Sequence, residues 1–428
     1  MAGEPPRANL PPLTLHVPEP KFRPGDPVDF AEVDVPPAGQ ARRPATAEPA
    51  RAFTDLAYTL VRVLDEEGRA VGPWNPRLSP DRLRAMLRSM VLLRAFDERM
   101  FRAQRQGKTS FYMKATGEEA VAVAATMALD YEDMCFPSYR QQGILIARGW
   151  SLVDMMNQIY SNSADRLQGK QLPIMYSVKE AGFFSISGNL ATQYPQAVGW
   201  AMASAAKGDT RIAAVWCGEG STAEGDFHSA CTFASVYRAP VIMNVVNNQW
   251  AISSFSGFAG AEATTFAARA VGYGIAGLRV DGNDALAVYA ATEWAAERAR
   301  TNQGPTLIEH FTYRAEGHST SDDPGQYRSE GEPNAWPLGD PIKRLKEHLI
   351  GLGEWDDDRH AAQDRELAEL VKASQKEAEK NGILGHGLHQ PLDTLFDGVF
   401  ETMPWHLREQ QRQMLAEEEA SGRPWARK

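Results

Sequence analysis

Cysteine is scarce in this sequence, and the few thiols do not follow a metal-ligand pattern. Cys135, Cys217 and Cys231 are widely spaced among 428 residues. Two of them lie in apolar or helical surroundings, which is typical of buried thiols in a reducing compartment. The sequence therefore predicts free cysteines.

Long apolar runs and an excess of basic charge are also missing. No run approaches the roughly 20 residues that are needed to span a bilayer. The N-terminus has neither the apolar core of a signal peptide nor the Arg- and Ser-rich, acid-poor pattern of a transit peptide. The formal net charge of -10 argues against nucleic acid and against an anionic membrane as partners. We expect a cytoplasmic protein.

Proline is unevenly distributed, since residues 1–50 contain 12 of the 27 prolines. Such a segment forms neither a helix nor a central strand. Its apolar residues are widely spaced, and they are Phe22, Val28, Phe30, Val33 and Val35. We expect an extended arm that packs over a surface. For residues 1–20 a disordered tail explains the composition equally well.

The remainder alternates between two hydrophobic periods. Periodicity and capping residues predict helices at 81–107, 117–129, 151–160, 191–207, 221–238, 265–270 and 285–300. Apolar runs predict strands at 212–217, 241–246, 275–280 and 305–313. Strands that alternate with helices indicate an α/β fold with a parallel sheet. Beyond residue 340 only helices are predicted, at 342–352, 357–379, 392–401 and 406–419. The expected organisation is an arm (1–50), an α/β domain (51–340) and a helical region packed on the same domain (341–428).

Two polar clusters follow neighbouring predicted strands. Gly218-Glu219-Gly220 ends the first strand, and Asn247-Asn248 ends the second after a gap of 26 residues. In a parallel sheet these ends meet at the edge where ligands bind. A carboxylate, an amide oxygen from Asn248 and the backbone carbonyl of Trp250 suit a Mg²⁺ ion that holds a pyrophosphate. Ordinary turn residues are the alternative, but the strand context favours the metal site.

These residues resemble the thiamine diphosphate fingerprint, with Glu219 in place of the usual aspartate. The flanking text, Gly-Glu-Gly-Ser-Thr-Ala-Glu-Gly-Asp, is similar to alpha subunits of 2-oxo acid dehydrogenases, and the branched-chain subfamily fits best. Further matching segments are Ser110-Phe-Tyr-Met113, Gly117-Glu-Glu119, Tyr139-Arg140, Leu190-Ala-Thr-Gln193 and His318-Ser-Thr-Ser-Asp-Asp323. The resemblance covers about residues 80–415 and implies a thiamine diphosphate-binding fold with thiamine diphosphate and Mg²⁺ as cofactors.

The resemblance also implies roles for individual residues. Arg140 would contact the diphosphate, Leu190 would lie under the thiazolium ring, and His318 would act as the catalytic loop histidine. The implied cofactor-binding set is Tyr139, Arg140, Gly188, Leu190, Glu219, Gly220, Ser221 and His318. Val246 departs from the family, because some members carry an arginine at that position.

A monovalent-cation site is implied at Ser187, Asn189, Thr192 and Gln193. A capping role at the start of the next helix explains these polar residues equally well. Phe111 and Tyr112 are implied to shape an apolar substrate pocket, although core aromatics would look the same. Ser319 and Ser329 match positions that a dedicated kinase modifies in animal members, where a phosphate would repel the diphosphate.

The sequence contains one α/β unit, whereas complete enzymes of this type need a second unit that carries a catalytic glutamate. The resemblance therefore implies a beta subunit in an α2β2 heterotetramer. The implied reaction is oxidative decarboxylation of branched-chain 2-oxo acids such as 3-methyl-2-oxobutanoate, with acyl transfer to lipoyl-lysine of a transacylase core. A pyruvate or acetoin dehydrogenase alpha subunit is the nearest alternative. A nicotinamide-dependent dehydrogenase is disfavoured because no Gly-x-Gly-x-x-Gly motif precedes an acidic strand end. A scaffold subunit with a decayed site is disfavoured because Arg140, Glu219, Asn248 and His318 are all present.

Overall fold

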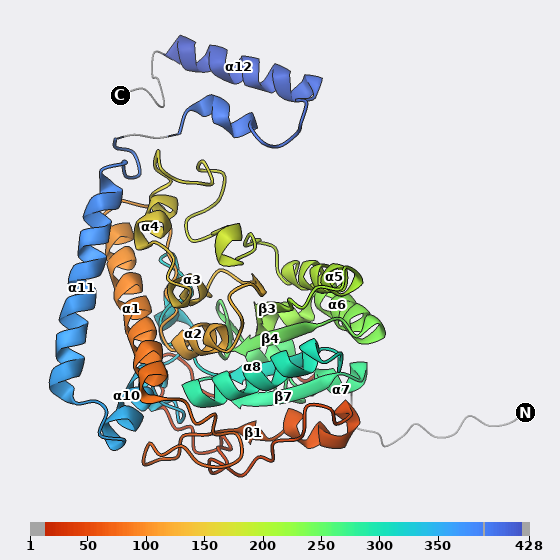
Figure 1. Cartoon of the computed structure of the whole chain (residues 1–428). Coiled ribbons are helices and arrows are strands. Elements are labelled where there is room, and N and C mark those ends of the chain that lie inside the picture. The colour runs from red at the N-terminus through yellow and green to blue at the C-terminus, as the bar shows by residue number, and fades with distance from the viewer. Residues whose placement is uncertain (1–12, 388–389, 422–428) are drawn as a thin grey trace, which may run out of the picture.

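A six-stranded, all-parallel sheet forms the centre of the molecule (Figure 1). The computed structural model describes residues 13–387 and 390–421. The strand order is β1-β7-β8-β4-β3-β2. The strands are β1 (Leu60–Val61), β2 (Met134–Phe136), β3 (Ala213–Gly218), β4 (Val241–Asn247), β7 (Ala276–Asp281) and β8 (Thr306–Phe311).

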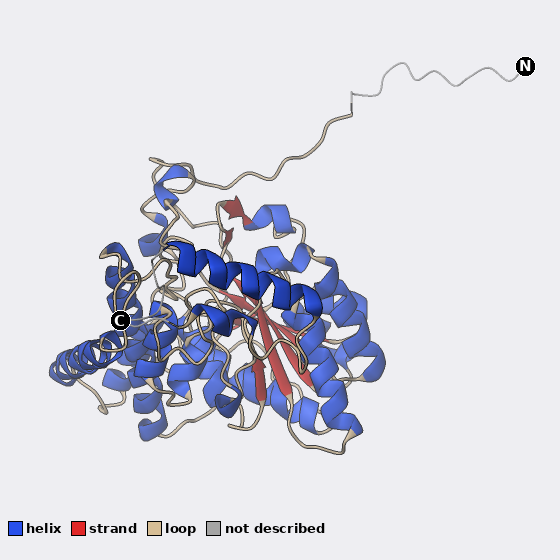
Figure 2. Ribbon diagram, turned by 90° about the horizontal axis from the view of Figure 1, so that it is seen from above, coloured by secondary structure: helices blue, strands red, loops and turns tan. Residues whose placement is uncertain are grey.

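Helices cover both faces of this sheet (Figure 2). Alternate residues of β3 enter different cores: Ala214 and Trp216 join one hydrophobic cluster, and Val215 joins the other. The first cluster is completed by α1 (Pro80–Arg105), α2 (Glu119–Met127), α3 (Gly143–Ala147) and α8 (Ala285–Arg300). The second is completed by α5 (Gln193–Ala206), α6 (Gly225–Tyr237) and α7 (Arg269–Tyr273). The predicted α/β class with a parallel sheet flanked by helices is confirmed.

Capping residues placed several helices correctly. The Asp284 side chain accepts hydrogen bonds from two backbone amides of the first turn of α8, which spans the predicted residues. Ser151 caps α4 (Leu152–Tyr160) by accepting from the amide of Asp154. Asp356 caps α11 (Asp357–Glu379), again over the predicted range. A side chain that satisfies free amides at a helix start is a local signal, and for this reason it can be read from sequence.

Three predicted helices were wrong in extent. The helix expected at 221–238 begins only at Gly225, because the 3₁₀ turn η3 (Glu219–Ala223) and an extended Glu224 precede it. The helix expected at 265–270 forms later, as α7. The helix expected at 392–401 is only the 3₁₀ turn η6 (Leu392–Phe396). The antiparallel hairpin of β5 (Trp250–Ala251) and β6 (Ser254–Phe255) was missed, since two-residue strands show no periodicity.

The proline-rich arm lies along the protein's own surface. Residues 13–49 form no helix or strand. The Phe30 ring packs edge-on against Trp336 and Tyr313, with centroid distances of 5.4 and 6.3 Å. The hydroxyl of buried Ser329 donates to the Asp26 carbonyl at 2.8 Å. The arm therefore covers the segment that follows β8, while its first twelve residues lie outside the described range.

The C-terminal part is helical, as expected. After α9 (Glu332–Ala335), α10 (Pro341–Gly351) and α11 pack beside α1 (Figure 1). In contrast, α12 (Trp405–Ser421) lies apart from this body and buries no residue. Within residues 13–387 and 390–421, no helix has the length and apolar character to cross a membrane. Residues 422–428 of the predicted helical region lie outside the described range.

Candidate active site

Glu219 and Asn248 meet at the carboxyl edge of the sheet, because β3 and β4 are hydrogen-bonded neighbours. The backbone N–H of Asn248 donates to Glu219 Oε2 at 3.4 Å. Glu219 is 1% exposed, and its Oε1 has no hydrogen-bond partner among the described atoms. Burial raises the pKa of Glu219 to about 7, with the charge of Glu118 adding to this and Arg314 opposing it. A buried carboxylate oxygen without a partner is an oxygen that a bound cation would satisfy.

Glu118 joins this pair, although its role was not foreseen from the sequence. Its Oε1 accepts from Asn248 Nδ2 at 2.7 Å and lies 3.5 Å from Arg140 Nε. Burial raises the pKa of Glu118, while Arg140 and Asn248 lower it in part. The turn before it needs Gly117, because a Cβ there would lie 2.3 Å from the Tyr313 carbonyl, and its φ is +95°. The Gly-Glu-Glu sequence at a helix start was the available signal.

Arg140, Tyr139 and His318 lie on the same side of the cluster. Arg140 is 3% exposed and donates to the carbonyls of Lys114 and His318. Its Nη2 also lies 3.3 Å from His318 Nδ1. The Tyr139 ring packs edge-on against the His318 ring at 5.5 Å. The guanidinium therefore positions the histidine that the sequence placed in the site.

The surroundings of His318 keep its ring neutral. Burial lowers the pKa of His318 to about 3; the charges of Arg140 and Arg314 add to this, and Asp322 opposes it. Because Nδ1 faces a guanidinium, which can only donate, the neutral ring carries its proton on Nε2. His318 can therefore donate one hydrogen bond at neutral pH without adding a charge.

The third predicted magnesium ligand, the carbonyl of Trp250, already accepts one hydrogen bond. Arg314 Nη1 donates to it at 2.9 Å, and Arg314 Nη2 donates to the Ile252 carbonyl and the Tyr327 hydroxyl. A carbonyl oxygen has a second lone pair, so one ligand position remains. Arg314 was not predicted. It lies three residues after the end of β8, but its contacts depend on the β5–β6 hairpin, which the sequence pattern did not show.

The segment predicted to bind a monovalent cation lies at the start of α5. The backbone N–H of Asn189 donates to Ser187 Oγ, and Thr192 Oγ1 donates to the backbone carbonyl of Asn189, each at 3.2 Å. Gln193 Nε2 donates to the Trp216 carbonyl in β3 at 2.7 Å. Thr192 occupies the N-cap position without a side-chain capping bond. The polar side chains therefore do not serve as a helix cap, and the potassium site stays a prediction.

The other predicted cofactor contacts fall in two places. Gly188 is exposed and Leu190 is 48% exposed, and no hydrogen bond or ion pair of the described residues joins them to the Glu219 cluster. Gly220 and Ser221 lie in the η3 turn beside Glu219. Gly220 approaches β5 closely, since a Cβ there would lie 2.5 Å from the Ala251 methyl group.

The two residues predicted to shape the substrate pocket lie in or against the main core. Tyr112 is fully buried, and its hydroxyl donates to Asp97 Oδ1 at 2.7 Å. Phe111 is half-buried and packs against the same hydrophobic cluster. This arrangement fits core aromatics, and the substrate-pocket role of Phe111 and Tyr112 stays a prediction.

Acidic side chains alone do not build a metal centre here. In the described part of the chain, no three His, Cys, Asp or Glu side chains gather in a metal-binding arrangement. Mg²⁺ commonly takes one or two carboxylates together with substrate phosphates and water. Glu219 with the neutral oxygens of Asn248 and Trp250 fits an ion that arrives with a diphosphate.

The ends of β3 and β4 bring together an amide and a buried carboxylate with one unbonded oxygen, and a buried arginine lies beside them. This arrangement fits a cofactor-dependent enzyme of the α/β class. The family model described as dehydrogenase E1 component matches residues 87–386. The model for the N-terminal part of the 2-oxoisovalerate dehydrogenase E1 alpha subunit matches residues 11–51. The chain belongs to the dehydrogenase E1 family, and within it to the branched-chain 2-oxo acid dehydrogenase alpha subunits.

Individual relatives agree with this assignment. The 2-oxoisovalerate dehydrogenase subunit alpha of Pseudomonas aeruginosa is 61% identical over 404 residues, which cover 94% of this chain and 98% of the relative. The mitochondrial subunit of Homo sapiens is 39% identical over 83% of this chain and 79% of its own length. The mitochondrial alpha 1 subunit of Arabidopsis thaliana is 36% identical over 90% and 80%, respectively. The predicted family is confirmed, and thiamine diphosphate dependence follows from it.

Proposed function

We propose that this chain holds the diphosphate half of thiamine diphosphate for the oxidative decarboxylation of branched-chain 2-oxo acids. The observation that carries this proposal is the partnerless oxygen of buried Glu219 beside Asn248, with Arg140 and His318 on the same side. The names of the relatives support 2-oxoisovalerate, also called 3-methyl-2-oxobutanoate, as the substrate.

The proposed division of work follows the chemistry of each side chain. Glu219, Asn248 and the Trp250 carbonyl hold Mg²⁺, because all three present oxygen atoms. Arg140 and the Nε2–H of His318 donate to the diphosphate, where a charged donor and a neutral donor meet an anion. When bound, thiamine diphosphate supplies the electron sink for loss of carbon dioxide. The buried surroundings strengthen each of these polar contacts.

We further propose that a beta subunit supplies the missing catalytic glutamate, in an α2β2 assembly that passes its acyl product to a lipoyl transacylase. In residues 13–387 and 390–421 there is one parallel sheet, and the second sheet is the two-stranded β5–β6 hairpin. This supports a chain that carries half of the machinery.

Reconstitution tests both proposals. The chain purified alone is expected to release no carbon dioxide from 3-methyl-2-oxobutanoate until the beta subunit is added. Full activity of the single chain would rule out the need for a partner. Faster turnover of pyruvate than of branched acids by the assembly would favour the pyruvate or acetoin dehydrogenase alternative.

Glu219→Ala tests the metal site directly. This variant is expected to lose Mg²⁺-dependent cofactor binding in the assembly while its circular dichroism spectrum stays unchanged. Unchanged cofactor affinity would remove Glu219 from the metal site.

A further inference from the structure

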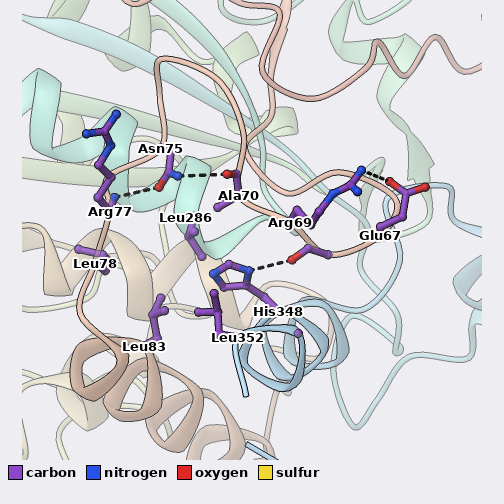
Figure 3. Close-up of a pocket in the computed structure, with 12 residues that line it drawn as sticks. Glu67, Arg69, Ala70, Asn75, Arg77, Leu78, Leu83, Leu286, His348 and Leu352 are labelled. Atoms are coloured by element: carbon purple, nitrogen blue, oxygen red, sulfur yellow. Dashed lines mark hydrogen bonds and ion pairs between the residues drawn. The ribbon is translucent and has the colours of Figure 1, made fainter. Parts of the chain in front are cut away.

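A pocket of about 420 Å³ is lined by none of the residues of the candidate active site. Figure 3 shows the side chains that line it. It is partly open to solvent and is lined by the loop before α1, the first turns of α1 and α8, and the end of α10. Its apolar lining consists of Leu78, Leu83, Leu286 and Leu352. The pocket volume is within the range of roughly 300–1,000 Å³ that small-molecule sites occupy.

One buried side chain presents an unused polar atom to this cavity. His348 is 5% exposed, and its Nδ1 lies 2.7 Å from the Gly68 carbonyl. A carbonyl only accepts, so Nδ1 carries the proton and the neutral ring has its lone pair on Nε2. Nε2 has no hydrogen-bond partner in the part of the chain that the structure describes. Figure 3 shows the ring lying between Leu286 and Leu352. The cavity thus offers an acceptor beside an aliphatic surface.

The rim adds one positive charge that is not already used. Arg69 is paired with Asp65 at 2.9 Å and with Glu67 at 2.8 Å. Asn75 is also occupied, since it donates to the Ala70 carbonyl and accepts from the Arg77 amide. The exposed guanidinium of Arg77 has no ion pair or hydrogen bond among the described residues. In Figure 3 its side chain points away from the leucines and His348, so a change of rotamer would bring the guanidinium over a ligand.

We propose that this cavity binds an aliphatic 2-amino or 2-hydroxy acid. The carboxylate pairs with Arg77, the adjacent N–H or O–H donates to His348 Nε2, and the branched chain covers the leucines. The two ligand classes share this chemistry, and the experiment separates them. The proposal does not depend on the reaction at the other site.

Binding is tested on the α2β2 assembly by titration calorimetry with L-leucine and with 2-hydroxy-4-methylpentanoate. At least one of them is expected to bind saturably. Two analogues remove one group each: 4-methylpentanoate lacks the donor, and leucinamide lacks the carboxylate. Both are expected to bind about tenfold more weakly, which corresponds to the loss of one charged or buried hydrogen bond. Equal binding of 4-methylpentanoate would overturn the proposed ligand class.

Variants assign the binding to this cavity. Arg77→Glu is expected to weaken the affinity at least tenfold. Arg238→Glu is the matched control, because Arg238 is also exposed and has a φ of +48°, close to the +50° of Arg77. Leu352→Trp, at a 51% exposed position of the lining, should fill the cavity and abolish binding without disturbing the core. No saturable binding to the unmodified assembly, or unchanged binding to both cavity variants, would overturn the proposal.

Discussion

Two buried carboxylates determine the electrostatics of the candidate active site. Glu118 and Glu219 are both almost fully buried, and burial raises the pKa of each. Two carboxylates in one buried site repel each other unless positive charges neutralise them. Arg140 and Arg314 lower the pKa of Glu118 in part, and Arg314 does so for Glu219, yet Oε1 of Glu219 has no hydrogen-bond partner among the described residues. A cation bound at Glu219 would lower the raised pKa of this carboxyl group and would satisfy its unbonded oxygen.

Glu118 should act as a positioning residue, because it holds both Asn248 and Arg140. We expect Glu118→Ala to weaken thiamine diphosphate binding roughly 30-fold at fixed Mg²⁺, since it leaves a buried arginine and amide without their partner. Glu118→Gln should retain most of the affinity, because its oxygen still accepts from Asn248. Fluorescence titration of the assembly measures this.

The control for this series is Glu354→Gln, which alters a half-exposed carboxylate paired with Arg84. It should leave cofactor affinity unchanged. If the alanine variant at position 118 also bound normally, the hydrogen bond to Asn248 and the ion pair with Arg140 would not position the site.

Asp97 should make stability depend on pH. It accepts hydrogen bonds from Tyr112, Ala115 and Gln142, yet burial raises its pKa to about 7. A raised folded-state pKa stabilises the fold at low pH, and this contribution is lost as the pH rises through about 7. From pH 5 to pH 8 the loss is roughly 3 kcal/mol.

Urea unfolding of the cofactor-free assembly at both pH values checks this expectation. Asp97→Asn cannot ionise, so its stability should fall less between pH 5 and pH 8 than that of the unmodified protein. Equal pH dependence of the two proteins would show that Asp97 is not the titrating group.

At the residue scale, sequence reasoning identified the polar residues at the ends of β3 and β4. It missed two residues that reach the site from other parts of the chain. Glu219 and Asn248 were predictable, because parallel strands end at a common edge. Glu118 and Arg314 reach the same place from a helix start and from the end of β8. Which helix start faces which strand end is decided by tertiary packing, and no local pattern encodes it.

At the scale of elements, capping side chains were the most informative signal, as α8 and α11 show. Strands of only two residues, such as β1, β5 and β6, were not predictable because they are too short to show a hydrophobic period. The arm was foreseen as an extended, packed segment because proline excludes helix while spaced apolar residues provide anchors. Its binding surface was not foreseen, since it is formed by Tyr313 and Trp336.

Phe30 should be the main anchor of the arm. It packs edge-on against Phe22, Tyr313 and Trp336. Phe30→Ala should cost roughly 2–3 kcal/mol of arm binding, because an aromatic side chain leaves a partly buried site. Limited proteolysis should then cut residues 13–49 faster while the core stays protected. Phe258→Ala, at a 60% exposed position, is the control and should not change the cleavage rate.

At the scale of the whole molecule, the fold class was readable from sequence, whereas the need for a beta subunit stays a proposal. The alternation of strands and helices indicated one parallel sheet, and the count of α/β units indicated a single half-site. The strand order β1-β7-β8-β4-β3-β2 was not readable, because it depends on which crossover packs on which face. The separation of α12 from the body was also unexpected.

Cofactor binding should stabilise the assembly only when Mg²⁺ is present. A ligand at 100 times its Kd adds about 2.7 kcal/mol to the folded state. Thiamine diphosphate with Mg²⁺ should therefore raise the Tm in scanning calorimetry, and EDTA should remove the increase. Glu219→Ala should show no increase under either condition. An increase that persists in EDTA would mean that the diphosphate binds without a metal.

The contact between Ser329 and the arm has a consequence for the timing of any modification. A phosphate can be added to this buried hydroxyl only while residues near Asp26 are lifted. If about 3 kcal/mol holds the arm, roughly one molecule in 150 is open at a given moment. A modifying enzyme would then work at a rate multiplied by this fraction, whereas the less buried Ser319 carries no such delay. Opening of the arm thus limits the rate at which Ser329 can be modified, whereas the rate at Ser319 does not depend on it.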